Sequence, residues 1–255
     1  MTAIFEMITI TILLAAILLA VRVRSMLTMW TVRQAWTWMV VALLAVLLHS
    51  ILSLPVLRMK EAIVSGMAYF AAIMLLTPLV TILGARRPGI FAWHWFVVLP
   101  MIVVLQWPAV SQLYGNQFRV PIELSAPLLM GVVVVLVMSV GTLLGTNSTC
   151  FALLYAAGIA ILLASAAKGA AVQSPVTRFS PILFFAAIWI FHRNLRLQTA
   201  RLRKASGASL QTKAILDLFA MLYGFAWSRR VQDRIRQFAA RERWTVRLTS
   251  AGFER

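Results

Sequence analysis

Histidine, cysteine and acidic side chains could bind a metal or move a proton, but here they are few and far apart. The 255-residue chain has three histidines, one cysteine and seven acidic residues. Haem or metal ligation needs several such ligands at one depth on neighbouring elements. If the apolar runs cross a membrane, His49 is predicted far from the other two, whereas His94 and His192 are predicted near one face of it. Aromatic and arginine residues flank His94 and His192, which favours a role at the level of the lipid headgroups. We therefore expect no metal site and no cofactor-binding residue.

Proton transfer and hydrolysis have equally little support. Glu61 and Glu123 stand at the ends of apolar runs beside basic residues, and Glu6 lies close enough to the N-terminus to reach water. No apolar run carries an acidic pair, and no HExxH pattern marks a zinc protease. Cys150 is the only cysteine, so we interpret it as a small apolar residue in lipid-facing surroundings. We expect no catalytic residue and no enzyme, although a cavity with converging polar groups would favour an intramembrane enzyme.

The segments that carry these residues are predicted to lie in a membrane. The chain is 62% hydrophobic and 12% charged, with a mean hydropathy of +0.88, and apolar runs of about 18 or more residues are typical of transmembrane helices. We predict an all-α polytopic membrane protein with about seven transmembrane helices. The last run has only thirteen apolar residues, so six spans with a re-entrant segment remain the alternative. The predicted spans are residues 3–21, 36–57, 62–83, 91–107, 127–145, 150–167 and 179–191.

Basic residues fix the expected orientation. Arg22 and Arg24 follow the first apolar run and no basic residue precedes it, which is the pattern of an uncleaved span. From His192 onward the chain holds fourteen Lys and Arg against four Asp and Glu, a net charge of +10 out of +17. Because basic segments stay in the cytoplasm, we predict a bacterial-type inner membrane with the N-terminus outside and the C-terminus inside.

Small residues predict how the fifth and sixth spans touch. Glycines one turn apart precede the turn TNST, and alanines at four-residue intervals follow it. Such faces let two helices approach closely, which drives association in lipid. The short turn favours an antiparallel hairpin, and a homodimer seam is the alternative. The predicted packing residues are Gly141, Gly145, Ala152, Ala156, Ala160 and Ala164.

Two prolines predict irregular helices in the third and fourth spans. Pro78 lacks a backbone donor and its ring clashes with the carbonyl of Met74, while Thr77 can bond a carbonyl freed nearby. Pro100 is expected to bend the fourth span near its centre. Broken helices line substrate sites in many transporters, so a small-solute permease is the alternative function.

The tail has two amphipathic pieces. Residues 214–227 form an apolar stretch too short to cross, which predicts a segment lying in the membrane interface. In the next piece, SRRVQDRIRQFAARERW (228–244), an apolar stripe of Val231, Ile235 and Phe238 runs among arginines. That pattern fits an anionic leaflet, and docking to a protein is the alternative; nucleic acid is not expected. The predicted contact residues are Arg229, Arg230, Arg234, Arg236, Arg241 and Arg243.

These patterns predict a division into a transmembrane bundle, residues 1–195, and a basic cytoplasmic tail, residues 196–255. Near the end of the tail, WTVRLT alternates like a strand but has no obvious mate in this helical chain; if it is a strand, another protein could supply the mate. The expected partners are the lipid bilayer, with anionic headgroups at the tail, and other membrane-protein subunits. Because charges within spans and catalytic motifs are missing, the favoured function is a non-catalytic accessory, anchoring or scaffold subunit of a membrane assembly.

Overall fold

A computed structural model describes residues 2–57, 59–85, 90–114, 126–168, 179–242, 247–249 and 252–254 of the chain. Helices make up almost all of them, which confirms the all-α class in this part of the protein. The helices are α1 (Thr2–Met26), α2 (Arg33–Leu52), the 3-10 turn η1 (Pro55–Leu57), α3 (Glu61–Met74), α4 (Leu76–Gly84), α5 (Ile90–Trp93), the π-helix η2 (His94–Val98), α6 (Leu99–Tyr114), α7 (Ala126–Gly141), α8 (Thr149–Lys168), α9 (Ser180–Lys204), α10 (Ala208–Tyr223) and α11 (Phe225–Arg241). Strands β1 (Arg247–Thr249) and β2 (Gly252–Glu254) follow.

Several of these helices suit a membrane. Within the described residues, four segments are long and apolar enough to cross one: Phe5–Met26, Arg33–Leu52, Ile63–Gly84 and His94–Ser111. The apolar helices Ala126–Gly141 and Thr149–Ala164 are shorter. Large apolar side chains also remain exposed along α1, α6 and α7, as a lipid-facing surface requires. The helices are therefore compatible with a helical membrane protein.

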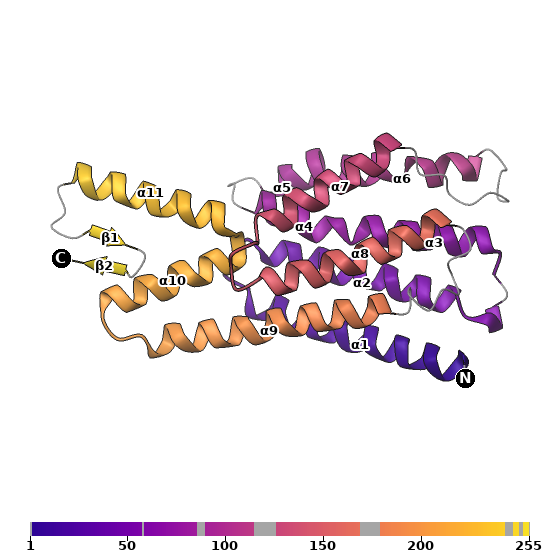
Figure 1. Cartoon of the computed structure of the whole chain (residues 1–255), viewed down its shortest axis with the longest axis horizontal. Coiled ribbons are helices and arrows are strands. Elements are labelled where there is room, and N and C mark those ends of the chain that lie inside the picture. The colour runs from indigo at the N-terminus through magenta and orange to yellow at the C-terminus, as the bar shows by residue number, and fades with distance from the viewer. Residues whose placement is uncertain are drawn as a thin grey trace.

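The helices lie side by side along the long axis of the molecule (Figure 1). α1 packs against α2 and α9, and α8 packs against α9 and α3. The N-terminus lies at one end of this bundle, and α10, α11 and the hairpin project from the other (Figure 1). α9 continues unbroken from the bundle into this projection, so the predicted boundary at 195/196 falls inside a helix.

The predicted irregularity at Pro78 is confirmed. α3 ends at Met74 and α4 begins at Leu76, so the helix is interrupted just ahead of the proline. The Thr77 hydroxyl donates to the Met74 carbonyl at 2.7 Å, replacing the bond that the proline cannot make. From α8, the buried Tyr155 hydroxyl donates to the carbonyl of Leu75 at 2.9 Å. The hydroxyl groups of Thr77 and Tyr155 therefore bond backbone carbonyls at the break.

The fourth apolar segment also departs from regular α-helix. Its residues from His94 to Val98 form the π-helix η2, directly before Leu99 and Pro100. π-helical turns commonly accompany such distortions. Trp93, at the end of α5, donates its ring N–H to the Val80 carbonyl at 3.2 Å and so ties this segment to α4.

The strand pattern near the end of the chain finds its mate within the same chain. β1 pairs antiparallel with β2, with Leu248 opposite Phe253. The expectation of a mate on another protein was therefore wrong, because the partner strand is too short to show a pattern of its own. The hairpin lies between α10 and α11, with β2 against α10 and β1 against α11 (Figure 1). Residues 244–246 of the predicted strand lie outside the described part.

Candidate functional site

The tail folds back onto the bundle. α10 begins after Gly207, runs toward the bundle and ends at Tyr223, and α11 leads away again (Figure 1). The turn between the two helices, residues 221–225, contacts the α1–α2 turn (27–32), the α7–α8 turn (142–148) and the adjoining helix ends. We call this contact the tail dock. It sets the position of the whole basic tail.

Polar bonds join the turn 221–225 to the α7–α8 turn. The buried Ser148 hydroxyl donates to the carbonyl of Met221 at 2.8 Å. The backbone N–H of Phe225 donates to the carbonyl of Thr142 at 2.9 Å. Both bonds use the backbone of the tail, so they hold its path in place independently of most side chains. Because the bond at Ser148 is buried, losing it would leave an unpaired acceptor inside the protein.

Tyr223 joins the tail to the α1–α2 turn. Its hydroxyl forms a 2.7 Å hydrogen bond with the hydroxyl of Thr31. Its ring is 6% exposed and lies 6.3 Å from the ring of Trp30, measured between centroids, and 4.5 Å from that of Phe219. A tyrosine with a buried ring and a bonded hydroxyl contributes both apolar area and direction to a contact.

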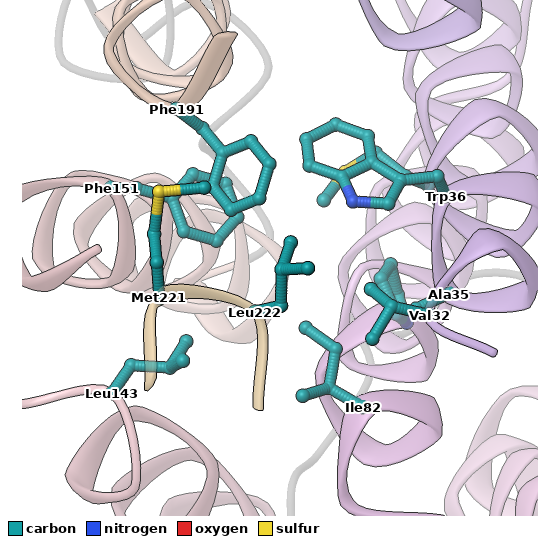
Figure 2. Close-up of a pocket in the computed structure, with 11 residues that line it drawn as sticks. Val32, Ala35, Trp36, Ile82, Leu143, Phe151, Phe191, Met221 and Leu222 are labelled. Carbon is teal, nitrogen blue, oxygen red and sulfur yellow. The ribbon is translucent and has the colours of Figure 1, made fainter. Parts of the chain in front are cut away.

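Apolar side chains complete the tail dock. Met221 and Leu222, both almost fully buried, point into a pocket at the end of the bundle (Figure 2). Trp36, Phe151 and Phe191 line the same pocket (Figure 2). The remaining lining residues are also apolar: Val32, Ala35, Met39, Pro78, Ile82 and Leu143. The tail therefore contributes two apolar side chains to the lining of this pocket.

The pocket continues into the bundle as a column of aromatic rings. Trp36 and Phe191 lie 4.7 Å apart between centroids, and Phe191 lies 5.1 Å from Phe151. Phe151 stacks on Tyr155 at 5.6 Å, and Tyr155 meets the edge of Phe184 at 5.4 Å. These separations are those of favourable aromatic pairs. The column links α2, α8 and α9 directly to the pocket that receives the tail.

Gly224 makes the turn 221–225 possible. Its backbone has φ +88° and ψ 165°, a region that only glycine adopts readily. A Cβ atom at this position would collide with the Thr142 carbonyl, whose oxygen accepts the bond from Phe225. The glycine thus permits both the turn and the close approach of the two backbones.

The predicted small-residue face is only partly used. α8 packs on α9 and α3 and makes a minor contact with α7. Ala152 is buried and Ala156 half-buried, but Ala160 and Ala164 are exposed. Among the described residues, no neighbouring atom lies within 4 Å of the position that a Cβ atom would take on Gly141 or on Gly145, which forms the turn at φ +74°. In this structure these six residues do not form one seam between α7 and α8.

A different glycine provides the close approach on α8. A Cβ atom built on Gly158 would lie 2.5 Å from the ring of Phe184 on α9. The absence of a side chain therefore lets the α9 ring approach the α8 backbone, as small residues do in membrane bundles. The sequence carried a signal for it, since Gly158 lies within an apolar run, but its spacing did not match the regular alanine repeat.

The predicted contact arginines occupy α11. Arg229, Arg230, Arg234, Arg236 and Arg241 are all exposed, and Arg243 lies outside the described residues. Arg236 pairs with Asp233 at 3.3 Å, and the Arg230 guanidinium lies 5.0 Å from the Trp227 ring centroid.

The apolar stripe predicted on α11 is divided. Val231 and Ile235 are half-buried, whereas Phe238 is 54% exposed. Ser228 and Ala239 are the buried residues of the helix, and its neighbours are α10 and β1. Much of the stripe is thus covered by the chain itself, while contact with headgroups stays a prediction.

Two histidines lie where their surroundings are aromatic. His94 stacks on Trp38, with 6.2 Å between ring centroids, and His192 lies 6.5 Å from Trp189. Burial and the guanidiniums of Arg22 and Arg196 lower the pKa of His192. Among the described residues, no three His, Cys, Asp or Glu side chains gather as a metal site requires.

The chain matches no protein-family model, no curated protein and no solved structure. The tail dock consists of apolar contacts, hydrogen bonds to backbone carbonyls and one hydrogen bond between two hydroxyls, an arrangement suited to holding a segment in place. The sequence did not predict the tail dock: the apolar side chains of residues 214–227 indicate that this segment has to be covered, but they do not indicate what covers it.

Proposed function

We propose that the chain is a polytopic protein of a bacterial-type inner membrane and crosses it seven times. In this proposal α3 with α4 form one crossing, and α5, η2 and α6 form another. The side-by-side helices and the placement of the N-terminus opposite the tail support an odd number of crossings (Figure 1). The excess of basic residues in the tail favours a cytoplasmic C-terminus and an external N-terminus.

We further propose a non-catalytic role, as an anchoring or scaffold subunit of a membrane assembly. The observation that carries the proposal is the tail dock. Two backbone hydrogen bonds, the Tyr223 hydroxyl and two buried apolar side chains hold a basic tail at a defined position on the bundle. A scaffold needs such a fixed platform, because pre-organised surfaces bind partners with less loss of entropy.

A second group of basic residues, at the base of the tail, is proposed to contact the lipid surface. Where α9 leaves the bundle, Arg193 and Arg196 are exposed, and Arg22 and Arg33 are exposed at the adjoining ends of α1 and α2. Arginines at this level suit anionic headgroups, which attract each basic group by about 1 kcal/mol. We propose lipid contact for these residues, at the base of the tail.

A small-solute permease remains the competing function. It would use the interrupted α3–α4 segment, as transporters use broken helices. Here the threonine and tyrosine hydroxyls at the break are bonded to backbone carbonyls, which leaves them committed to holding the helices. The scaffold is therefore the better supported of the two.

Purification in mild detergent distinguishes the two functions. The chain carries an affinity tag after residue 255, and the purified complex is weighed by native mass spectrometry. A scaffold subunit is expected to bring a different protein in fixed stoichiometry, and the partner should be lost when the tail is removed after residue 205. Recovery of the chain alone, or only of copies of itself, would contradict the scaffold and favour the permease.

A further inference from the structure

One face of α11 carries a line of exposed arginines. Arg230, Arg234 and Arg241 recur at i, i+4 and i+11, which places them on one side of an α-helix. All three are exposed, whereas the buried residues Ser228 and Ala239 lie on the side facing α10 and β1. We call Arg230, Arg234 and Arg241 the basic stripe. The fold turns this stripe away from the rest of the tail.

The direction of α11 decides what the stripe can reach. α11 starts at the tail dock and runs outward along the same long axis as the bundle helices (Figure 1). At 1.5 Å per residue, Arg241 lies about 16 Å farther from the bundle than Arg230. The Debye length is about 8 Å at physiological ionic strength, so the outer end of the stripe is screened from a leaflet at the bundle end. A lipid surface could engage only its inner end.

The residues around the basic stripe favour a protein partner over a nucleic acid. Asp233 lies on the same helix and Glu242 directly follows it, and both would repel phosphates. Phe238, 54% exposed, lies one turn from Arg234 and from Arg241. Arginine and aromatic residues are enriched in protein interfaces and among the residues that contribute most to the binding free energy.

We propose that the basic stripe binds an acidic amphipathic helix of a partner subunit. Carboxylates at i, i+4 and i+11 of that helix would face the three guanidiniums, and apolar residues beside them would cover Phe238. The inference rests on the proposed scaffold function, for which it names the chemistry of the partner.

A designed peptide tests the proposal on the full-length protein in neutral-lipid nanodiscs. The probe is a fluorescent helical peptide with glutamates at i, i+4 and i+11, and its glutamine analogue is the control ligand. Changing Arg230, Arg234 and Arg241 to Gln is expected to weaken binding of the glutamate peptide roughly tenfold, as three partly exposed ion pairs would. The analogue should bind weakly to both proteins.

A charge-matched variant separates the stripe from general attraction. Arg201, Arg203 and Lys204 are exposed at the end of α9, and changing all three to Gln removes the same net charge. This control is expected to keep peptide affinity within about twofold of wild type. Equal weakening by both triple variants would overturn the proposal. Anionic vesicles or an RNA oligonucleotide that depend on the stripe more strongly than the peptide would also overturn it, assigning the surface to lipid or nucleic acid.

Co-purification keeps the two proposals distinguishable. If the wild-type chain brings a stoichiometric partner and the stripe variant brings it equally well, the stripe proposal fails and the scaffold stands. If the wild-type chain brings no partner, the scaffold proposal fails whatever the peptide does. Loss of the partner from the stripe variant, with retention by the α9 control, would support both.

Discussion

Replacing Gly224 with alanine should release the tail from the bundle. The residue has φ +88° and ψ 165°, and a Cβ atom there would collide with the backbone carbonyl of Thr142. That carbonyl accepts the N–H of Phe225 at 2.9 Å, so moving the backbones apart breaks a bond of the tail dock. Gly207 has φ +93°, and no neighbouring atom in the described part of the chain lies within 4 Å of its Cβ position, so it offers a matched control.

Both substitutions cost free energy through backbone strain, but only the one at Gly224 also causes a collision and the loss of a hydrogen bond. Alanine in this backbone region costs on the order of 1–3 kcal/mol at either glycine. At Gly224 the collision and the lost hydrogen bond add about 1–3 kcal/mol more. The excess over the Gly207→Ala variant therefore measures the tail dock itself, free of the backbone strain that both variants carry.

Hydrogen exchange of the full-length protein in detergent measures this difference. Peptides that contain the N–H of Phe225 should exchange roughly five- to a hundredfold faster in Gly224→Ala than in Gly207→Ala, which corresponds to the extra free energy. Peptides from the middle of α2 and α8 should be unaffected, because the bundle remains folded. Equal exchange at Phe225 in the two variants would refute the idea that the turn 221–225 is held against Thr142.

Three further outcomes test the bundle. Gly158→Leu should strongly lower thermal stability in detergent, because Phe184 fills the space that the new side chain needs, while Gly141→Leu should be tolerated; the reverse order would contradict the packing. Tyr155→Phe removes the hydrogen bond from the buried hydroxyl to the Leu75 carbonyl and should cost about 0.5–1.5 kcal/mol in the free energy of unfolding; an unchanged value would mean that this bond does not stabilise the contact between α8 and the α3–α4 break. The pKa of His192 lies below its usual value of about 6.5, so neutral His192 stabilises the fold above that pH and this contribution is lost as the pH falls. In His192→Gln the free energy of unfolding should therefore fall less between pH 7 and pH 5 than in the wild type. The same fall in both proteins would exclude this linkage.

Local features of the fold could be predicted from the sequence. The interruption at Pro78 and its repair by Thr77 follow from one missing donor and one nearby hydroxyl, which depend only on residues within a turn. The apolar runs likewise mark the helices, since hydropathy is a property of each segment. The bond from Tyr155 to the Leu75 carbonyl could not be predicted, because the two residues lie 80 positions apart in the sequence.

Contacts between helices were much harder to predict. The alanine repeat of α8 indicates that a helix comes close, but it does not say which one, and here the neighbours are α9 and α3. In lipid, every face of a transmembrane helix is apolar, so side chains that meet protein resemble those that meet lipid. Gly158 and Phe184 became recognisable as a pair only once α8 and α9 were placed together.

The tail shows the same ambiguity. Met221 and Leu222 form part of an apolar side that either a leaflet or the bundle could cover, and the structure places them in the bundle. Gly224 interrupts an apolar run in the sequence, and its role depends on a positive φ and on the distant Thr142 carbonyl. Neither can be read from a linear pattern.

Site-directed labelling of single cysteines tests most directly whether the tail is a cytoplasmic platform on an odd number of crossings. Cys150 is the only cysteine, so Cys150→Ser gives a cysteine-free background for Thr2→Cys or Ala240→Cys, the second at an exposed position on α11. A membrane-impermeant maleimide is applied to spheroplasts before and after permeabilisation. A cytoplasmic tail on an odd number of crossings predicts labelling of residue 2 in intact spheroplasts and of residue 240 only after permeabilisation. Labelling of both positions under the same condition would place both ends on one side and contradict it.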